Sequence, residues 1–164
     1  MRENMYRLDD LLHLASTDAS ELGPFLLIGD GRYEASSTFQ YVTTTAPAFD
    51  DESPRPLSEA VFIGLRKRTP RFENVILVGR ADSNDIRITH SSVSKLHARI
   101  DDVDADGFSV RDAGSRNGTF VDALEAKTPI RTSCGDVLRF GDRRFRVRRT
   151  GRVLAAIAKG PAKV

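Results

Sequence analysis

The feature that most constrains this fold is a run of short strand-like segments between residues 60 and 149. Each segment is apolar or alternates apolar with polar residues, and turn-forming Gly, Asp and Asn residues separate the segments. In the last one, RRFRVRR, alternation places Phe145 and Val147 on one face and three arginines on the other. This spacing is typical of an all-β sandwich. The predicted strands are residues 60–68, 74–80, 85–89, 97–101, 108–112, 119–123, 136–140 and 143–149.

The N-terminal part of the chain has a different pattern. Residues 7–15 place Leu8, Leu11, Leu12 and Ala15 at i, i+3, i+4 and i+7, which predicts a short amphipathic helix. Two apolar or alternating runs then flank a Gly-Asp-Gly turn and predict a hairpin, and a segment rich in Pro, Thr and acidic residues reads as a linker. The hairpin strands are residues 25–29 and 39–42, and the linker is residues 43–56.

These patterns divide the chain into three parts. Residues 1–56 form an acidic N-terminal extension with a short helix, a hairpin and a linker. Residues 57–150 form the sandwich domain. Residues 151–164 are too short for a domain, and we expect a fraying helix or a C-terminal tail there.

The charge of the chain is unevenly distributed. Residues 1–54 have a net charge of −7, the remaining residues +9, and the whole chain only +2. A basic body favours an anionic partner, which could be a nucleic acid, a phosphate or an acidic peptide, and composition does not choose among them. The charge difference also predicts that the extension docks on the sandwich through its helix and hairpin.

Several classes of function are poor matches to the composition. The single cysteine, Cys134, excludes an internal disulfide framework, and the three scattered histidines show no metal-ligand spacing. We therefore expect no metal and no cofactor. No apolar run is long enough for a membrane span, and the first ten residues lack the apolar region of a signal peptide. The sequence thus predicts a cytoplasmic protein with no membrane contact.

A set of short polar motifs stands in a fixed order between residues 79 and 141. They fall between the predicted strands, and binding groups are commonly found on loops of a rigid scaffold. The motifs are Gly79-Arg80, Asn84-Asp85-Ile86, Ser94 with His97 three residues on, Asp112, Ser115 to Thr119, Gly135-Asp136 and Phe140-Gly141. The ordered set resembles the forkhead-associated (FHA) domain, a module that binds phosphothreonine peptides. With its flanking strands the resemblance covers roughly residues 58–149 and implies an FHA-type β-sandwich of two twisted, mainly antiparallel sheets.

The resemblance also implies a site. Arg80 and Ser94 would contact the phosphate, Lys95 would be a second basic contact, and Asn117 would hold the peptide backbone. A phosphate has strong acceptor oxygens and nearly two negative charges, so cationic groups, hydroxyls and N–H donors suit it. The predicted phosphopeptide-binding residues are Arg80, Ser94, Lys95, Ser115, Arg116 and Asn117, and the predicted supporting residues are Gly79, His97, Gly118 and Thr119.

The expected function is that of a non-catalytic phosphothreonine-peptide-binding adaptor in Ser/Thr-kinase signalling. Its partner would be a phosphothreonine-containing protein, either a Ser/Thr kinase or a kinase substrate. The alternative is a phosphate-independent protein-interaction scaffold. A triad of Ser94, His97 and Asp112 is rejected because nothing resembles a nucleophile elbow. The arginines between residues 139 and 149 alternate with core residues, which favours a solvated strand face over a nucleic-acid patch.

Overall fold

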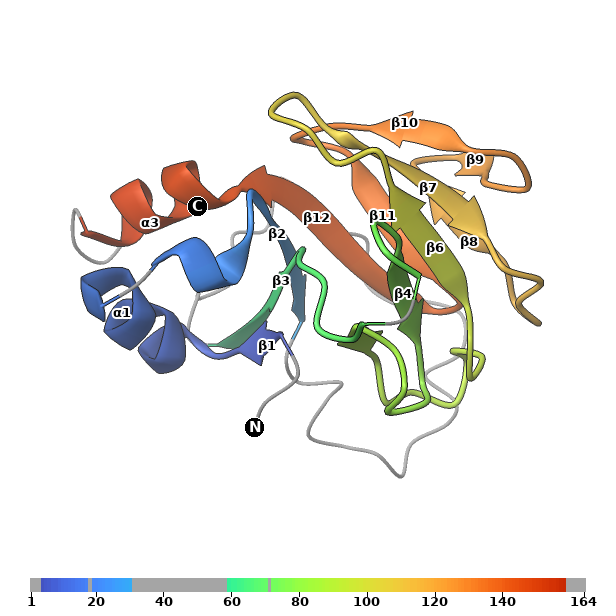
Figure 1. The fold of residues 1–164 in the computed structure, drawn as a ribbon, viewed down its shortest axis with the longest axis horizontal. Helices are drawn as coiled ribbons and strands as arrows, with labels where there is room; N and C mark the ends of the chain where they lie inside the picture. The colour runs from blue at the N-terminus through green and yellow to red at the C-terminus, as the bar shows by residue number, and fades with distance from the viewer. Residues whose placement is uncertain (1–3, 18, 31–58, 71, 159–164) are drawn as a thin grey trace.

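The computed structural model describes residues 4–17, 19–30, 59–70 and 72–158. Within these ranges two β-sheets pack face to face, and two α-helices lie to one side of the sandwich (Figure 1). In spatial order, the larger sheet contains β1 (Met5–Tyr6), β3 (Ala60–Gly64), β2 (Phe25–Asp30), β12 (Arg143–Arg149), β11 (Val137–Phe140), β8 (Thr119–Val121) and β9 (Leu124–Glu125). The smaller sheet contains β10 (Ile130–Thr132), β7 (Phe108–Asp112), β6 (Ala98–Asp101), β4 (Ile76–Gly79) and β5 (Ile86–Arg87).

The strand pairs are antiparallel except for β4 and β5, which are parallel. Each of the eight strands predicted between residues 60 and 149 contains an observed strand. The predicted two-sheet sandwich with a short N-terminal helix is therefore confirmed. Three very short strands, β1, β9 and β10, were not predicted because two or three residues are too few to show a period.

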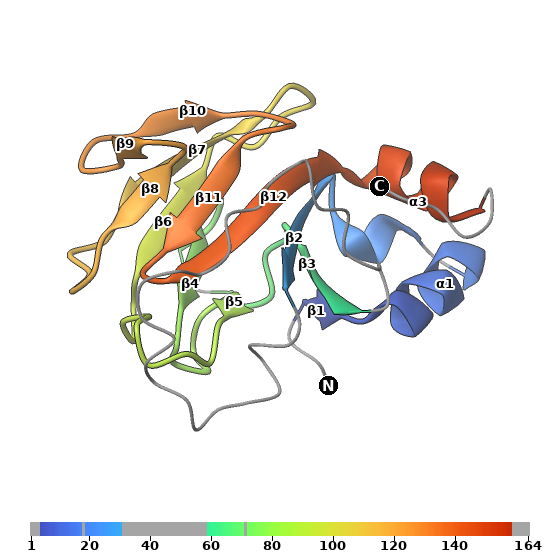
Figure 2. The same ribbon diagram turned by 180° about the vertical axis from the view of Figure 1, so that it is seen from behind.

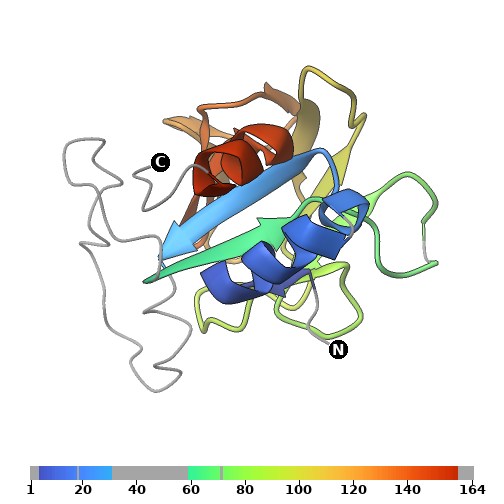
Figure 3. The same cartoon turned by 90° about the vertical axis from the view of Figure 1, so that its left-hand side faces the viewer.

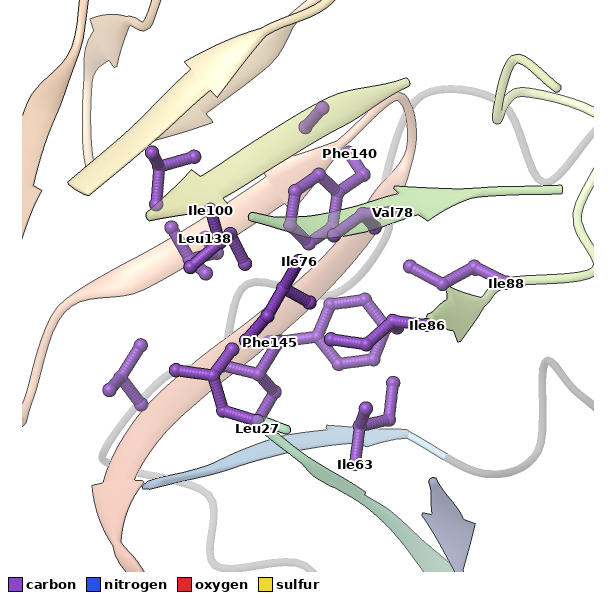
Figure 4. Close-up of a cluster of buried hydrophobic side chains, with 14 of the residues drawn as sticks. Leu27, Ile63, Ile76, Val78, Ile86, Ile88, Ile100, Leu138, Phe140 and Phe145 are labelled. Carbon is purple, nitrogen blue, oxygen red and sulfur yellow. The ribbon is translucent and has the colours of Figure 1, made fainter. Parts of the chain in front are cut away.

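The main hydrophobic core lies between the two sheets (Figure 4). Alternation fills it, since Phe145 and Val147 of β12 are fully buried while Arg144, Arg146 and Arg148 point away. Phe25 of β2 meets Phe108 of β7 edge to face, with ring centroids 5.4 Å apart. The two sheets are thus held together mainly by apolar burial, which is the dominant favourable contribution to folding.

A second apolar cluster covers the outer face of β2 and β3. Helices α1 (Leu8–Thr17) and α3 (Thr150–Ala158) lie over this face, with the short 3-10 helix η1 (Ala19–Leu22) beside them (Figure 3). The residues buried here come from both helices, η1 and the two strands: Leu11, Leu22, Leu26, Ile28, Phe62, Val153 and Ile157. The predicted docking of the N-terminal helix is confirmed. The C-terminal segment, predicted as a fraying helix or a tail, forms α3 over Thr150–Ala158.

The predicted hairpin is wrong. β2 pairs with β12 along one edge and with β3 along the other, so both of its edges are taken within the described part of the chain. Residues 39–42, the expected partner, lie outside the described residues. A local turn signal predicted a local partner, whereas burial of Phe25 and Leu27 between the sheets places β2 at the centre of the larger sheet. A segment that we assigned to the N-terminal extension therefore supplies a strand of the sandwich.

None of the helices in the described residues is long and apolar enough to cross a membrane.

Candidate functional site

Main-chain hydrogen bonds join the loop after β4 to the loop between β5 and β6. The N–H of Arg80 donates to the Ser94 oxygen at 2.9 Å, and the N–H of Ala81 donates to the Lys95 oxygen at 3.2 Å. The N–H of Arg116, in the turn after β7, donates to Ser94 Oγ at 3.0 Å. Three loops that are separate in the sequence thus bring the predicted binding residues together.

Arg80 is exposed at the end of β4, and one of its N–H groups is held. Its Nε donates to the Val93 oxygen at 3.0 Å, and its own main-chain oxygen accepts from Arg87 Nε at 3.1 Å. These contacts fix the base of the side chain and leave the two terminal nitrogens of the guanidinium without a partner in the described residues. Such a group can donate two parallel hydrogen bonds to one anion.

Ser94, Lys95 and Arg116 lie next to Arg80. Ser94 is partly buried and its hydroxyl accepts the Arg116 N–H, so the hydroxyl hydrogen stays available as a donor. The side chains of Lys95 and Arg116 are exposed. Within the described ranges none of Arg80, Lys95 and Arg116 forms an ion pair. This end of the sandwich therefore carries three cationic residues on the loops that hold the Ser94 hydroxyl.

His97 is fully buried behind these loops. Its Nδ1 accepts the N–H of Ser94 at 3.0 Å, so Nε2 carries the ring proton and donates to the Gly118 oxygen at 2.8 Å. Burial lowers the pKa of His97, against the opposing effects of the Gly118 carbonyl and the Asp112 carboxylate. A neutral imidazole of fixed tautomer thus connects the Ser94 loop to the turn after β7, the position predicted for it.

Asp112 organises the turn over residues 112–119. Its carboxylate accepts from the N–H groups of Gly114 and Ser115, both at 2.9 Å, and from the hydroxyls of Ser115 at 2.5 Å and Thr119 at 2.6 Å. Burial by itself raises the pKa of Asp112, but these hydrogen bonds outweigh it and hold the pKa below its usual value. The Ser115 hydroxyl also accepts the Gly118 N–H at 2.9 Å. Ser115, predicted to bind ligand, uses its hydroxyl inside the turn.

Asn117 extends from this turn to the loop before Ser94. Its Nδ2 donates to the Ser92 main-chain oxygen at 2.8 Å, which joins positions 25 residues apart in the sequence. Gly118 follows with a φ of 87°, a conformation that favours glycine. The observed contact of the Asn117 amide is within the protein, and its side-chain oxygen has no partner in the described residues.

Sequence reasoning did not assign roles to two neighbouring residues that support the Arg80 loop. Asn84 is buried, and its Nδ2 donates to the oxygens of Ala81 at 2.9 Å and Lys95 at 2.6 Å. Arg68 Nη2 donates to the oxygens of Asp82 and Asn84, each at 2.6 Å. The motif Asn84-Asp85-Ile86 was a usable signal for Asn84. Arg68 precedes the motifs and carried no signal.

Asp85 anchors the segment that includes Arg68. Its buried carboxylate accepts from the N–H groups of Arg68 at 2.7 Å, Thr69 at 2.6 Å and Leu77 at 2.9 Å, and from Lys67 Nζ at 3.1 Å. Burial acts to raise the pKa of Asp85, but the three main-chain donors and the lysine lower it below its usual value. The Asp85 carboxylate therefore stays charged and holds the segment of Arg68 and Thr69 through their main-chain N–H groups.

The rejected triad has no catalytic geometry. His97 contacts the main-chain N–H of Ser94, whereas the Ser94 hydroxyl contacts Arg116. Asp112 hydrogen-bonds within its own turn. In the part of the chain that the structure describes, no group of three or more His, Cys, Asp or Glu side chains could hold a metal ion.

Comparison with known proteins places these loops in a family. Residues 76–141 match the family model described as the FHA domain. FhaB of Mycobacterium tuberculosis is 35% identical over 69 residues, which are 42% of this chain and 44% of the relative. FhaB of Mycolicibacterium smegmatis is 33% identical over 66 residues, 40% of this chain and 42% of the relative. Each match spans less than half the length of the relative.

Among solved structures, Mycobacterium tuberculosis EmbR in complex with a low-affinity phosphopeptide is similar at 28% identity and a TM-score of 0.42, over 46% of this chain and 20% of that one. The matched segment of the present chain, residues 76–141, contains every predicted site residue and the loops that hold them. The order of motifs and the two-sheet sandwich agree with the family match, which assigns an FHA domain to residues 76–141 of this chain.

Proposed function

We propose that this protein binds phosphothreonine-containing proteins through the loops that carry Arg80, Ser94 and Arg116. The observation that carries the proposal is the group of cationic residues on the loops that hold the Ser94 hydroxyl, with the Arg80 guanidinium fixed through its Nε. A dianionic phosphate complements this group in charge and in hydrogen bonding. Phosphothreonine is the ligand that membership of the FHA family favours.

The residues of the site divide into those that contact the phosphopeptide and those that support the loops. Arg80 and the Ser94 hydroxyl donate to the phosphate, and Lys95 and Arg116 add positive charge around it. Asn117 Nδ2 uses one N–H on the Ser92 oxygen. Its Oδ1 accepts from the peptide main chain, or its second N–H donates to it. Ser115 joins His97 as a supporting residue, because its hydroxyl is used by Asp112 and Gly118.

The function is recognition without chemistry. The side chains that meet at this end are donors and cations, and their hydrogen bonds give no nucleophile paired with a base. We therefore propose an adaptor in Ser/Thr-kinase signalling whose partner is a phosphorylated kinase or kinase substrate.

Calorimetry with a phosphothreonine peptide selected from a degenerate library tests the proposal. The unphosphorylated twin of that peptide should not bind measurably. Hydrogen bonds to charged groups contribute about 1.5–3 kcal/mol each, so Arg80→Ala should weaken binding by about tenfold to a hundredfold. Arg99→Ala removes an exposed arginine from the outer face of β6 and is the matched control, with affinity unchanged.

Equal affinity for the two peptides would overturn the proposal in favour of a phosphate-independent scaffold. Equal affinity of Arg80→Ala and the native protein would remove Arg80 from the site even if the phosphate is required.

A further inference from the structure

The outer face of β8, β11 and β12 carries a group of arginines beside the helix-covered part of the larger sheet. Because β12 alternates, its residues Arg144, Arg146 and Arg148 lie on the face opposite Phe145 and Val147. In the register of the sheet, Arg139 of β11 lies directly between Phe120 of β8 and Arg144 of β12. We call this surface the basic face; its residues are Phe120, Arg139, Arg144, Arg146 and Arg148.

The pair Arg139 and Arg144 is unfavourable for folding. Like charges placed directly opposite each other on antiparallel strands destabilise a sheet. Burial lowers the pKa of Arg139, the charge of Arg144 lowers it further, and Asp142 opposes both effects. In the described residues Arg144 has no hydrogen-bonding or ion-pair partner, so its guanidinium is available to an external anion.

Arg139 is held in place rather than extended into solvent. Its Cζ lies 3.9 Å from the centroid of the Phe120 ring, and its Nη1 donates to the Gly141 oxygen at 2.8 Å. A guanidinium stacked on an aromatic ring keeps its edge free for a carboxylate. Among the described residues, acidic side chains near this pair include Asp142, in the β11–β12 turn, and Glu125, opposite Phe120 on β9.

The basic face is continuous with the candidate binding loops. The N–H of Gly141 donates to the Gly118 oxygen at 3.0 Å, and the N–H of Asp142 donates to Ser92 Oγ at 2.9 Å. The Phe120 ring packs against Gly118, since a Cβ at Gly118 would lie 2.7 Å from a carbon of that ring. Gly118 follows Asn117, so the stacked pair of Arg139 and Phe120 begins where the proposed peptide site ends.

We propose that the basic face binds Asp or Glu side chains that flank the phosphothreonine, so that this protein selects acidic phosphopeptides. The inference rests on the proposed function and adds a second contact to it. Two adjacent guanidiniums suit carboxylates, and a peptide held in the loops brings its flanking residues to this surface.

A nucleic acid fits the surface less well. The other exposed pair of opposed arginines, Arg99 and Arg111, lies on β6 and β7 of the smaller sheet. The outer faces of the two sheets point in opposite directions, and in Figure 2 β11 and β12 pass in front of β4 and β6. The arginines therefore do not form one continuous surface along which a phosphate backbone would run.

The test uses two phosphothreonine peptide pools that differ only in their flanks. One pool has Asp and Glu at the flanking positions, and the other has Asn and Gln there. Competition against a labelled phosphopeptide gives the affinity of each pool for the native protein, for Arg144→Gln and for Arg99→Gln. Arg144 is replaced rather than Arg139, because Arg139 also stacks on Phe120 and its loss would disturb that ring. Arg99→Gln is the control, since it removes the same charge from the opposite face.

The native protein should prefer the acidic pool by about two- to fivefold, the range of an exposed ion pair, and added salt should reduce the preference. Arg144→Gln should lose the preference but bind the amide pool as the native protein does, and Arg99→Gln should keep the preference. Equal affinity of the native protein for both pools would overturn this inference alone. An equal loss of the acidic-pool preference in Arg144→Gln and Arg99→Gln would overturn it as well.

Two further outcomes separate the rival explanations. Arg144-dependent binding of a labelled DNA duplex, without a preference between the pools, would assign the basic face to nucleic acid and overturn the inference. Failure of both pools to bind would overturn the proposed function and this inference together.

Discussion

The side-chain amide of Asn4 donates a hydrogen bond to the main-chain oxygen of Asp85 at 3.2 Å, across 81 residues of sequence. The same nitrogen donates to the Arg66 oxygen at 2.8 Å, and Asn4 is buried with a φ of 59°. The N-terminal end of the described chain is thus attached to Asp85, whose carboxylate accepts from the N–H of Arg68.

Replacing Asn4 should destabilise the fold. Asn4→Gly keeps the positive φ available and removes both hydrogen bonds, and an unsatisfied buried group costs about 1–3 kcal/mol. Asn4→Ala should cost about 1–2 kcal/mol more because its Cβ disfavours the left-handed conformation. Denaturant unfolding of both variants measures these changes, and a native-like midpoint for Asn4→Gly would show that the two contacts contribute nothing.

Gly79→Ala should disturb the floor of the site. A Cβ at this position would lie 2.3 Å from the Lys95 oxygen and 2.7 Å from Asn84 Nδ2, so the β4 end and the Ser94 loop must move apart. Overpacking of this kind costs about 1–3 kcal/mol, and we expect a lower unfolding midpoint with weaker phosphopeptide binding.

Gly151→Ala is the matched control for this substitution. Apart from its chain neighbours and the backbone of its own helix, no heavy atom of the described residues lies within 4 Å of a Cβ at Gly151, in the first turn of α3. Replacing a helical glycine by alanine stabilises by about 0.5–1 kcal/mol. If both variants lowered the midpoint equally, the close approach at Gly79 would not be the cause.

His97 should make stability depend on pH below its ordinary pKa of 6.5. The folded state holds the pKa of His97 below this value, so the unfolded chain binds a proton first as the pH falls. The free energy of unfolding should therefore decrease from about pH 6.5 downward, until the pH reaches the lower pKa of the folded state.

Nitrogen chemical shifts of the imidazole check this directly, and should report a neutral ring protonated at Nε2 at pH 6.5. In His97→Gln the corresponding part of the pH dependence should disappear. A charged His97 at pH 6.5 would contradict the contacts that define its tautomer.

The sequence by itself determined which segments form strands and which motifs lie on the loops between them. Alternation assigns Phe145 and Val147 to the core and the intervening arginines to the surface, because successive side chains of a strand point to opposite faces. The order of motifs likewise predicted the FHA fold and the convergence of Arg80, Ser94 and Arg116.

Only the tertiary structure decided partners that are distant in the sequence. β2 pairs with β3 and β12 rather than with residues 39–42. The partner of a strand depends on the packing of the whole sheet, so the residues near β2 in the sequence do not indicate it. For the same reason the structure alone places the Ser115 hydroxyl on Asp112 and joins the Asn117 amide to Ser92. Local periodicity fixes the face on which a side chain lies, but its hydrogen-bond partner depends on which loops the packed sheets bring within 3 Å.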